Sequence, residues 1–213
     1  MIKPNLGQLF NAGDLRVMPK GQIVIYEGDP ITNLWYLTEG YVKVYSILET
    51  GSERIIFIYS PGDVFPITSY LSGSGITRYF YECMTEVKAR RINPEYLRDK
   101  VKDNLELGES LIHYADSMNQ QFIQRIDMLA AASAKHKIIA LLDFLVKKTG
   151  SNEPMSRLNL PLTAQNIADM CGLTRETTTK KLASLKREGL VVNSRPMTIN
   201  RDKLAKLTER LNQ

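Results

Sequence analysis

The chain is poor in the residues that build metal centres and disulfide frameworks. It contains two cysteines, Cys83 and Cys171, and two histidines, His113 and His136. Two isolated thiols make no disulfide framework, and the cysteine ligands of an iron–sulfur cluster are missing. The strand-rich region 15–92 has no histidine, which excludes a catalytic metal held there by imidazoles. We expect no metal, no cofactor and no enzymatic activity, since nucleophile–base and phosphate-loop motifs are absent too.

Long apolar runs are also missing. No segment approaches the roughly 18 uninterrupted apolar residues of a membrane-spanning helix. The N-terminal segment has no charged stretch followed by an apolar run, which argues against a signal peptide. Because the few thiols also suit a reducing compartment, we expect a cytoplasmic protein with no membrane partner.

Positive charge is confined to one end of the chain. The formal net charge is +5, but residues 137–213 carry 14 Lys and Arg against 7 Asp and Glu. The remaining residues therefore have a net charge of −2. A basic C-terminal third on a mildly acidic body is typical of a polyanion-binding domain, and a merely soluble basic surface is the alternative.

A period of two dominates residues 15–92, and turn signals containing glycine at 28, 40, 51 and 62 interrupt it. Many short strands at such spacing predict a closed or rolled antiparallel β domain. The expected strands are 22–26, 34–37, 41–45, 54–58, 64–65, 78–85 and 87–92. The small, polar loop 71–75 is either a plain connector or a lid over a cavity in the roll.

A helical region follows Pro94, and its apolar residues recur at steps of three and four. This heptad-like seam predicts pairing with the same helix of a second copy, so we expect a homodimer. The alternative is a helix that lies only on its own β domain. The predicted interface residues are Leu111, Ala115, Met118, Phe122, Ile126 and Leu129.

The pattern divides the chain into three parts. We expect a β-roll domain over 1–103, a dimerisation helix over 104–130 and a basic C-terminal domain over 131–213. Residues 130–135 have small side chains and no pattern, and are interpreted as a hinge before a helix at 137–148.

Residues 162–190 have the pattern of a helix, a tight turn and a second helix. Thr163 and Thr174 are plausible N-caps, and Gly172 stands where the turn needs a positive φ. An ordinary helical hairpin is the alternative, but the polar start of the second helix favours insertion into a major groove. Two apolar runs then flank residues 193–196, which predicts a hairpin wing with Arg195 at its tip, in reach of a phosphate.

Taken together, the motifs resemble the Crp/Fnr regulators, the cyclic-AMP receptor protein family. The matching stretches are EGDP at 27–30, PGD at 61–63 and LTAQNIADMCGLTRETTTKKLASLKREGLV at 162–191. The resemblance covers nearly the whole chain. It implies an α+β architecture with an N-terminal β-roll like that of cyclic-nucleotide-binding domains, a long dimerisation helix and a C-terminal winged helix-turn-helix.

The resemblance also implies roles for residues in the second helix. Arg175, Glu176 and Lys180 match base-reading positions, and Thr179 projects from the same helix. Arginine suits guanine and glutamate suits cytosine, which implies a palindrome with TGTGA-like half-sites. Lys180 replaces the family's second arginine, so discrimination at its base should be weaker. The residues that match phosphate-contacting positions are Thr163, Thr174 and Thr177.

The ligand pocket departs from the family pattern. The Gly-Glu pair of cyclic-AMP binders is replaced by Pro66-Ile67, and their adenine-contacting Thr-Ser pair aligns with Phe122-Ile123. Their Arg-Ser pair falls near Thr77-Arg78, where Arg78 is either a displaced anion ligand or a surface charge. Without the carboxylate and with apolar side chains, this pocket should not hold cyclic AMP.

The effector is therefore unknown, or absent with control by abundance. Haem ligation by His113 or His136 is disfavoured because both lie in helical patterns typical of surface or hinge positions. Cys83 and Cys171 are interpreted as small core residues, with oxidation sensing as the alternative. The family often contacts RNA polymerase through the loop that corresponds to 150–157, so polymerase is a candidate partner beside double-stranded DNA. The competing function is a ligand-sensing module that acts through protein partners.

Overall fold

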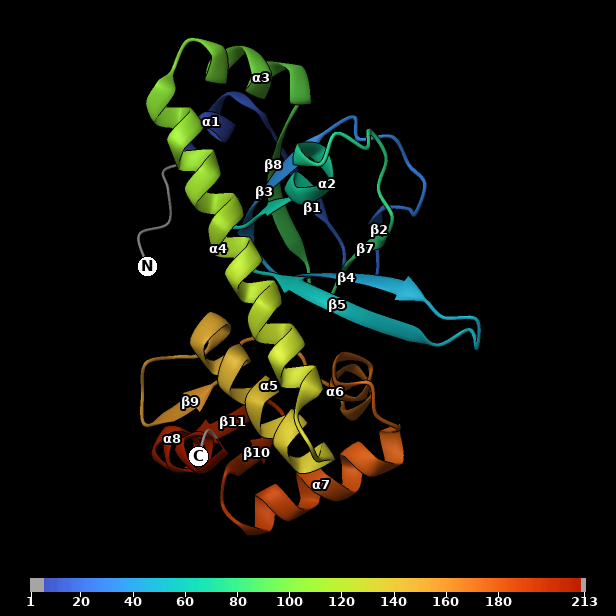
Figure 1. The fold of residues 1–213 in the computed structure, drawn as a ribbon, viewed down its shortest axis with the longest axis vertical. Helices are drawn as coiled ribbons and strands as arrows, with labels where there is room; N and C mark the ends of the chain where they lie inside the picture. The colour runs from blue at the N-terminus through green and yellow to red at the C-terminus, as the bar shows by residue number, and fades with distance from the viewer. Residues whose placement is uncertain (1–5, 212–213) are drawn as a thin grey trace. The chain divides into compact units, whose positions relative to one another are not determined.

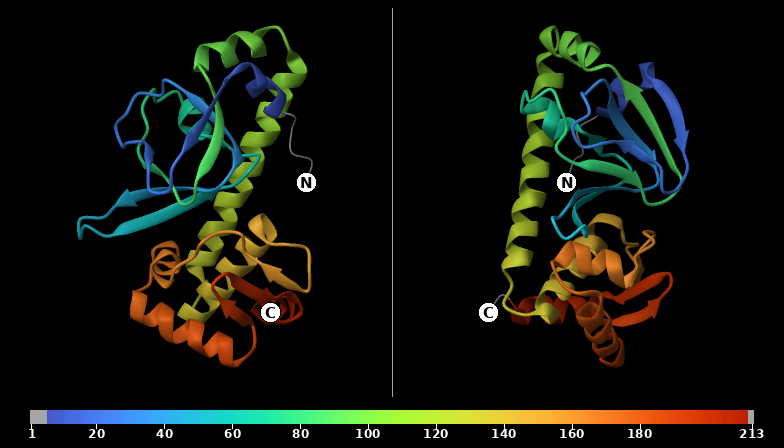
Figure 2. Two further views of the ribbon diagram at one scale, coloured as in Figure 1. Left: turned by 180° about the vertical axis from the view of Figure 1, so that it is seen from behind. Right: turned by 90° about the vertical axis from the view of Figure 1, so that its right-hand side faces the viewer.

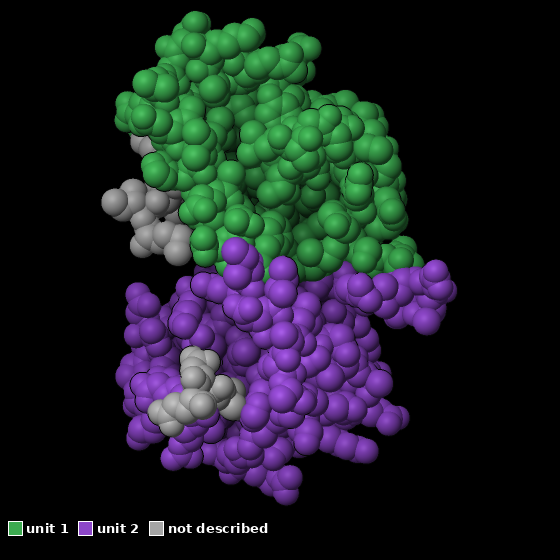
Figure 3. Space-filling view, in the orientation of Figure 1, with its two compact units in different colours: residues 1–47, 56–122 green, residues 48–55, 123–213 purple. Residues whose placement is uncertain are grey.

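The computed structural model describes residues 6–211. The chain forms two compact units, and each is described by itself (Figure 3). Unit 1 takes in residues up to 47 and 56–122, and unit 2 takes in 48–55 and the residues from 123 onward. The outer limits of the predicted domains, at 1 and 213, lie outside the described residues.

Unit 1 contains two four-stranded sheets that form the predicted β-roll (Figure 1). One sheet has the order β1-β8-β3-β6 and the other has the order β2-β7-β4-β5. Pairings such as β3–β8 and β4–β7 are antiparallel. The strands are β1 (Asp14–Met18), β2 (Ile23–Ile25), β3 (Leu34–Glu39), β4 (Val42–Ile47), β5 (Glu53–Tyr59), β6 (Val64–Phe65), β7 (Phe80–Cys83) and β8 (Val87–Ile92).

Several elements of the roll differ from the sequence prediction. Strand β1 was not predicted because four of its five residues are exposed, which leaves no alternation. The expected strand at 78–85 shortens to β7, since Thr77 and Arg78 belong to the preceding turn. The short helix or turn that residues 1–13 predict is present in their described part as α1 (Leu6–Leu9) and the 3₁₀ turn η1 (Phe10–Ala12), whereas the short helix α2 (Ile67–Leu71) was not predicted.

Aromatic side chains fill the interior of the roll. Phe57, Tyr59, Phe65 and Tyr81 are all at most 1% exposed. The ring centroids lie 5.2 Å apart for Phe57 and Tyr59, 5.5 Å for Tyr59 and Phe65, and 5.7 Å for Phe65 and Tyr81. These distances are those of favourable edge and offset contacts, so the chain's own rings occupy the centre of the roll.

Two helices follow the roll. Helix α3 (Pro94–Lys102) begins with proline at its first position, and the side chain of Asn93 caps it by accepting from the Glu95 N–H. Helix α4 (Leu105–Ala130) has 26 residues, and its part within unit 1, up to residue 122, runs beside the roll in both views of Figure 2. Its Tyr114 hydroxyl accepts from the backbone N–H of Val64 at 2.7 Å, which ties the helix to β6.

The structure changes the predicted seam on α4. Leu111 is 8% exposed and Met118 is fully buried, so neither is free to meet a second copy. Phe122 is half-buried, and its ring centroid lies 5.2 Å from that of Phe57. The predicted seam combined residues of two adjacent faces of one helix. This happened because residues that face the roll and residues that face outward both recur at steps of three and four.

Unit 2 contains four further helices and a three-stranded sheet with the order β10-β11-β9. The helices are α5 (Ala134–Thr149), α6 (Ala164–Cys171), α7 (Arg175–Arg187) and α8 (Arg201–Leu211); the strands are β9 (Met155–Arg157), β10 (Val191–Ser194) and β11 (Met197–Asn200). None of the helices within the described part of the chain is long and apolar enough to cross a membrane.

Two predictions in unit 2 need correction. The hinge is shorter than 130–135, because Ser133 caps α5 by accepting from the His136 N–H and the helix begins at Ala134. The loop 150–157 is not entirely irregular, because its end forms β9 and pairs antiparallel with β11. A three-residue strand carries too little alternation to be recognised in a sequence.

Candidate DNA-binding site

The first helix of the motif, α6, begins with a reciprocal cap. The Thr163 hydroxyl accepts from the Asn166 N–H at 3.1 Å, and the Asn166 side-chain oxygen accepts from the Thr163 N–H at 3.0 Å. This capping box satisfies two backbone donors that helix geometry leaves without partners. Ile167, Ala168 and Cys171 are fully buried, so the predicted inner face of α6 is confirmed.

A left-handed glycine joins the two helices. Gly172 has φ 63° and ψ 41°, a conformation that favours glycine because it has no Cβ. The N–H groups of Gly172 and Leu173 both donate to the carbonyl of Ala168, which closes the helix end. Thr174 then caps α7 by accepting from the Thr177 N–H at 3.2 Å.

The N-terminal half of α7 presents a polar face. Arg175, Glu176, Thr179 and Lys180 are all exposed, whereas Thr178 and Leu185 are fully buried. Positions 175 and 179, like 176 and 180, are one helical turn apart, so the four side chains share one face. Among the described residues, Arg175, Glu176 and Lys180 have no side-chain hydrogen bond or ion pair within the chain. Their donors and acceptors are therefore available to an external partner.

The three candidate phosphate-contacting threonines differ in availability. The Thr163 hydroxyl donates to Asn166 at 2.8 Å, and the Thr174 hydroxyl donates to the Thr177 hydroxyl at 2.9 Å. Both protons are thus used inside the caps. The Thr177 hydroxyl only accepts in this arrangement, so of the three it has the proton best placed for a phosphate oxygen.

The wing is formed by β10 and β11. Arg195 lies in the turn between them and is exposed. The Asn193 side chain accepts from the Arg195 N–H at 3.4 Å and donates to the Arg195 carbonyl at 3.3 Å, which shapes the turn. The structure therefore places Arg195 at the wing tip, as the sequence indicated.

Sequence reasoning missed a buried arginine that supports α6. Arg125, on α4, is 5% exposed, and its Nη2 donates to the carbonyls of Met170 at 2.8 Å and of Ile55 at 3.3 Å. Met170 lies in the last turn of α6, where carbonyls have no partner within the helix. Burial lowers the pKa of Arg125 to about 10, so the group stays charged at neutral pH. In the sequence, Arg125 falls among the polar residues that lie off the predicted seam, and nothing local indicates its burial.

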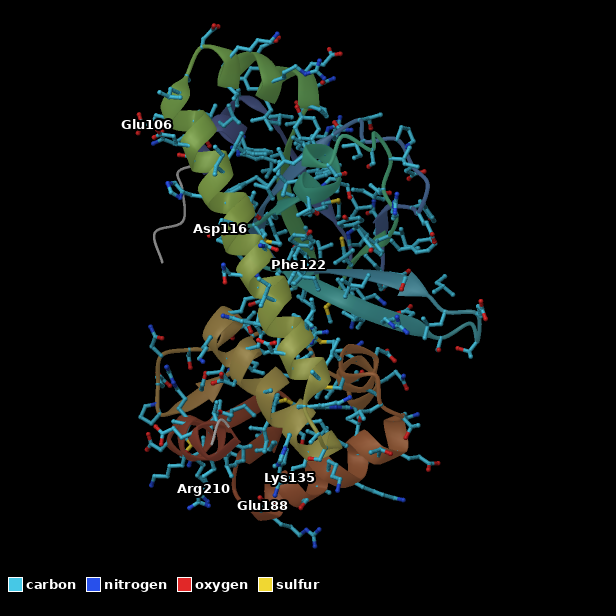
Figure 4. All side chains as sticks on the ribbon, in the orientation of Figure 1. Glu106, Asp116, Phe122, Lys135, Glu188 and Arg210 are labelled. Carbon is cyan, nitrogen blue, oxygen red and sulfur yellow. The ribbon has the colours of Figure 1, made fainter. Side chains whose placement is uncertain are left out.

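An ion pair fixes the other end of α7. The Lys135 ammonium lies 2.8 Å from the Glu188 carboxylate (Figure 4). The Lys135 hydrogen bond, with a smaller contribution from Ser184, lowers the pKa of Glu188. The Lys203 ammonium donates to the Glu188 carbonyl at 2.9 Å. Because the two side chains remain 35% and 38% exposed, solvent screens the pair and its effect on stability should be small.

Thr178 offers a test of the packing beneath α7. Its hydroxyl is the one buried side-chain oxygen of the described residues that lacks a hydrogen-bond partner. Thr178→Val keeps the shape and removes this group, so we expect the free energy of unfolding to rise by about 1 kcal/mol. Urea denaturation measures the change. Thr179→Val is the control, because Thr179 is exposed, and equal changes in both variants would contradict the interpretation.

The predicted effector-pocket residues differ in their exposure to solvent. Pro66, Ile67 and Thr77 are buried, and the Thr77 hydroxyl donates to the Tyr26 carbonyl at 2.8 Å. Arg78 is exposed, which fits a surface charge rather than a displaced anion ligand. The two residues on α4 also differ: Phe122 packs against Phe57, and Ile123 is 44% exposed.

The loop 71–75 borders a surface depression of about 610 Å³, together with Ile31, Tyr70 and Arg98. Its serines bond locally: the Ser72 hydroxyl donates to the Ser69 carbonyl at 2.8 Å. Since aromatic rings fill the roll behind it, these features support a connector rather than a lid over the interior.

Both cysteines are fully buried. Burial raises the pKa of the Cys83 thiol to about 11 and that of Cys171 to about 12, although the Arg125 charge partly opposes the second shift. Thiolates are the reactive form. We therefore expect a disulfide reagent to label neither thiol of the native protein within minutes and both in guanidinium. Rapid labelling of the native protein would contradict this expectation and support the alternative that a cysteine senses oxidation.

Metal ligation finds no support among the described residues, where no group of three or more His, Cys, Asp or Glu gathers. His113 is exposed and His136 is half-buried in the first turn of α5.

Comparison with known proteins agrees with this geometry. The model of the cyclic nucleotide-binding domain matches residues 15–104, and that of the Crp-like helix-turn-helix domain matches residues 136–207. The global nitrogen regulator of Synechococcus elongatus is 25% identical over 174 residues, which cover 81% of this chain and 78% of that protein. The CRP-like cAMP-activated global transcriptional regulator of Mycobacterium tuberculosis is 26% identical over 174 residues, which cover 81% of this chain and 77% of that protein.

The fold is shared with solved structures. FixK2 from Bradyrhizobium japonicum superposes with a TM-score of 0.80 at 21% identity, covering 92% of this chain and 97% of that one. The roll, the long helix and the helix-turn-helix follow in the same order as the two matched domains. The chain is a DNA-binding transcription regulator and belongs to the Crp/Fnr family.

Proposed function

We propose that the protein is a homodimer that binds a palindrome with TGTGA-like half-sites. The observation that carries this proposal is the exposed face of α7, where Arg175, Glu176 and Lys180 are free of partners among the described residues. Arginine pairs with guanine through two hydrogen bonds, and glutamate accepts from the cytosine amino group. Lys180 has no planar fork, so the base that it meets should be less strictly specified.

Backbone contacts should come from the N-terminus of α7 and from the wing. Thr177 and Arg195 are exposed or half-exposed donors suited to phosphate oxygens. Helix N-termini also attract phosphates through their free N–H groups. Such contacts position the protein but do not specify bases.

Regulation by cyclic AMP is not expected. Phe57, Tyr59, Phe65 and Tyr81 occupy the interior of the roll with their own rings. Ile67 stands in the place of the family's glutamate, and it is 1% exposed. A cyclic nucleotide would have to displace well-packed aromatic side chains and would find no carboxylate for its ribose.

We assign the sensor domain to 1–103, the dimerisation helix to 104–130 and the DNA-binding domain to 131–213.

A regulator of transcription acts where the chromosome is, so we infer a cytoplasmic location. RNA polymerase is a candidate partner through residues 150–157, whose first part is an exposed loop.

Selection from random DNA with the purified, ligand-free protein tests the proposal. We expect enrichment of a TGTGA-like palindrome and an affinity that falls steeply with salt, as phosphate neutralisation requires. The matched control is a duplex with one scrambled half-site. Enrichment of an unrelated motif would contradict the assigned base contacts. Absence of any salt-dependent DNA binding would favour a module that acts through proteins.

A further inference from the structure

Thr179 directs its hydroxyl at its own helix. It lies one turn after Arg175 on the exposed face of α7, and its hydroxyl donates to the Arg175 carbonyl at 2.8 Å. Threonine commonly bonds in this way to the carbonyl four positions before it. The proton of this hydroxyl is therefore used inside the helix, and it reaches a base or a phosphate only if that bond breaks.

The methyl group of Thr179 is the part of the side chain that remains for a partner. It occupies a different staggered position on Cβ from the hydroxyl. Since the residue is exposed and its hydroxyl lies against the backbone, Thr179 presents an apolar group to its surroundings. Thr177 differs, because its hydroxyl accepts from the Thr174 hydroxyl and keeps its proton for an outside acceptor.

The surroundings of Thr179 favour a close approach of α7 to its partner. Ala183 follows one turn later and is also exposed, whereas Glu176 and Lys180 beside them have long, flexible side chains. An apolar contact needs heavy atoms within about 4.5 Å of each other. A side chain as short as threonine reaches this distance only where the helix backbone itself lies near the bases.

We propose that the methyl group of Thr179 contacts the 5-methyl group of a thymine, and that this thymine stands between the two guanines of the TGTGA-like half-site. The inference rests on the proposed DNA recognition and adds an apolar determinant to its charged contacts. Thymine carries its methyl group in the major groove, where a threonine methyl is a suitable partner. Cytosine lacks this group, so the contact selects thymine among the pyrimidines.

The order of side chains along α7 gives the position of the thymine. A helix rises about 1.5 Å per residue, which puts Thr179 about 6 Å from Arg175 along the axis. Stacked base pairs are about 3.4 Å apart, so this rise spans one to two base steps. With Arg175 on the first guanine and Lys180 on the second, the thymine within that span is the one between them. The first thymine of the half-site lies on the other side of the first guanine.

Replacing the middle thymine by uracil tests the contact, because uracil lacks only the methyl group and keeps the same hydrogen-bonding edges. The probe is a duplex palindrome with TGTGA half-sites, measured with the full-length protein by fluorescence anisotropy. We expect uracil in one half-site to weaken binding about fourfold, the effect of one buried methyl-sized group. Uracil at the first thymine is the matched control and should leave the affinity unchanged. Equal losses at both positions would overturn the proposed position.

Two substitutions at residue 179 identify the protein group that makes the contact. Thr179→Ser keeps the hydroxyl and removes the methyl group, so this variant should bind the thymine and uracil duplexes equally well. Thr179→Val keeps a methyl group and removes the hydroxyl, so the fourfold preference should remain. The salt dependence of both variants should equal that of the wild type, because no phosphate contact changes. A preference that survives in Thr179→Ser, or is lost in Thr179→Val, would overturn the proposal.

The outcomes separate this contact from the proposed function. If the wild type binds the palindrome and uracil at the middle position does not weaken binding, the methyl contact fails although the proposed half-site stands. If the wild type does not prefer the palindrome to a scrambled duplex, the proposed recognition fails, and the methyl contact fails with it.

Discussion

Arg175→Ala should lower the affinity for the selected palindrome by about 2 kcal/mol for each half-site, since a bidentate arginine–guanine contact has this magnitude. Arg175 is exposed at the first position of α7 and has no partner within the described chain. Fluorescence anisotropy with the palindrome and with variants at the contacted base gives both affinity and preference. We expect the preference at that base to weaken as well.

Two matched variants separate base reading from charge. Arg175→Lys keeps the positive charge and removes the planar fork, so it should recover little of the base preference. Arg195→Ala, at the wing tip, should weaken binding to all sequences alike and reduce the salt slope by about one phosphate contact. An Arg175→Ala protein that bound the palindrome as tightly as the wild type would contradict the proposed recognition.

Arg125→Met should lower the free energy of unfolding of unit 2 by about 3 kcal/mol, because it removes the guanidinium that donates to two buried backbone carbonyls. These are the carbonyls of Met170, in the last turn of α6, and of Ile55. Relief of the buried charge offsets part of the loss. Urea denaturation followed by amide exchange of the segment 164–173 locates the effect.

The control for this variant is Gln124→Met, since Gln124 is the exposed neighbour of Arg125 on α4. It should change stability by less than about 0.5 kcal/mol, as for most surface substitutions. The stability of Arg125→Lys should lie between those of the wild type and Arg125→Met, because the ammonium keeps the charge but lacks the rigid planar geometry that directs Nη2 at both carbonyls. Unchanged exchange rates in α6 for Arg125→Met would show that this guanidinium does not stabilise the motif.

Arg125 connects stability with recognition. By satisfying a C-terminal carbonyl of α6, it holds the end of the helix that leads into Gly172 and the start of α7. The side chains proposed to read bases begin at the next helix, only a few residues later. A loosened α6 should therefore weaken DNA binding through misplacement of α7, with no loss of a direct contact.

The sequence by itself determined the elements that depend on short windows. Apart from β1, the roll strands follow from alternation, and the ends of α6 and α7 follow from caps at Thr163 and Thr174 and from Gly172. These signals are local because the hydrogen bonds that they satisfy join residues three or four positions apart. The helical spacing of the apolar residues likewise predicts that Arg175 lies on the outward face of α7.

Only the tertiary structure decided which face of α4 is inward and which is outward. Leu111 and Ile112 are adjacent in sequence, yet one is 8% exposed and the other 70%. Helical spacing alone allows either residue to belong to a buried seam. Which face of α4 turns toward the roll depends on contacts such as the hydrogen bond between Tyr114 and Val64, which are 50 positions apart. The burial of Arg125 likewise depends on two carbonyls 45 and 70 positions away, and no local pattern reports contacts at such separations.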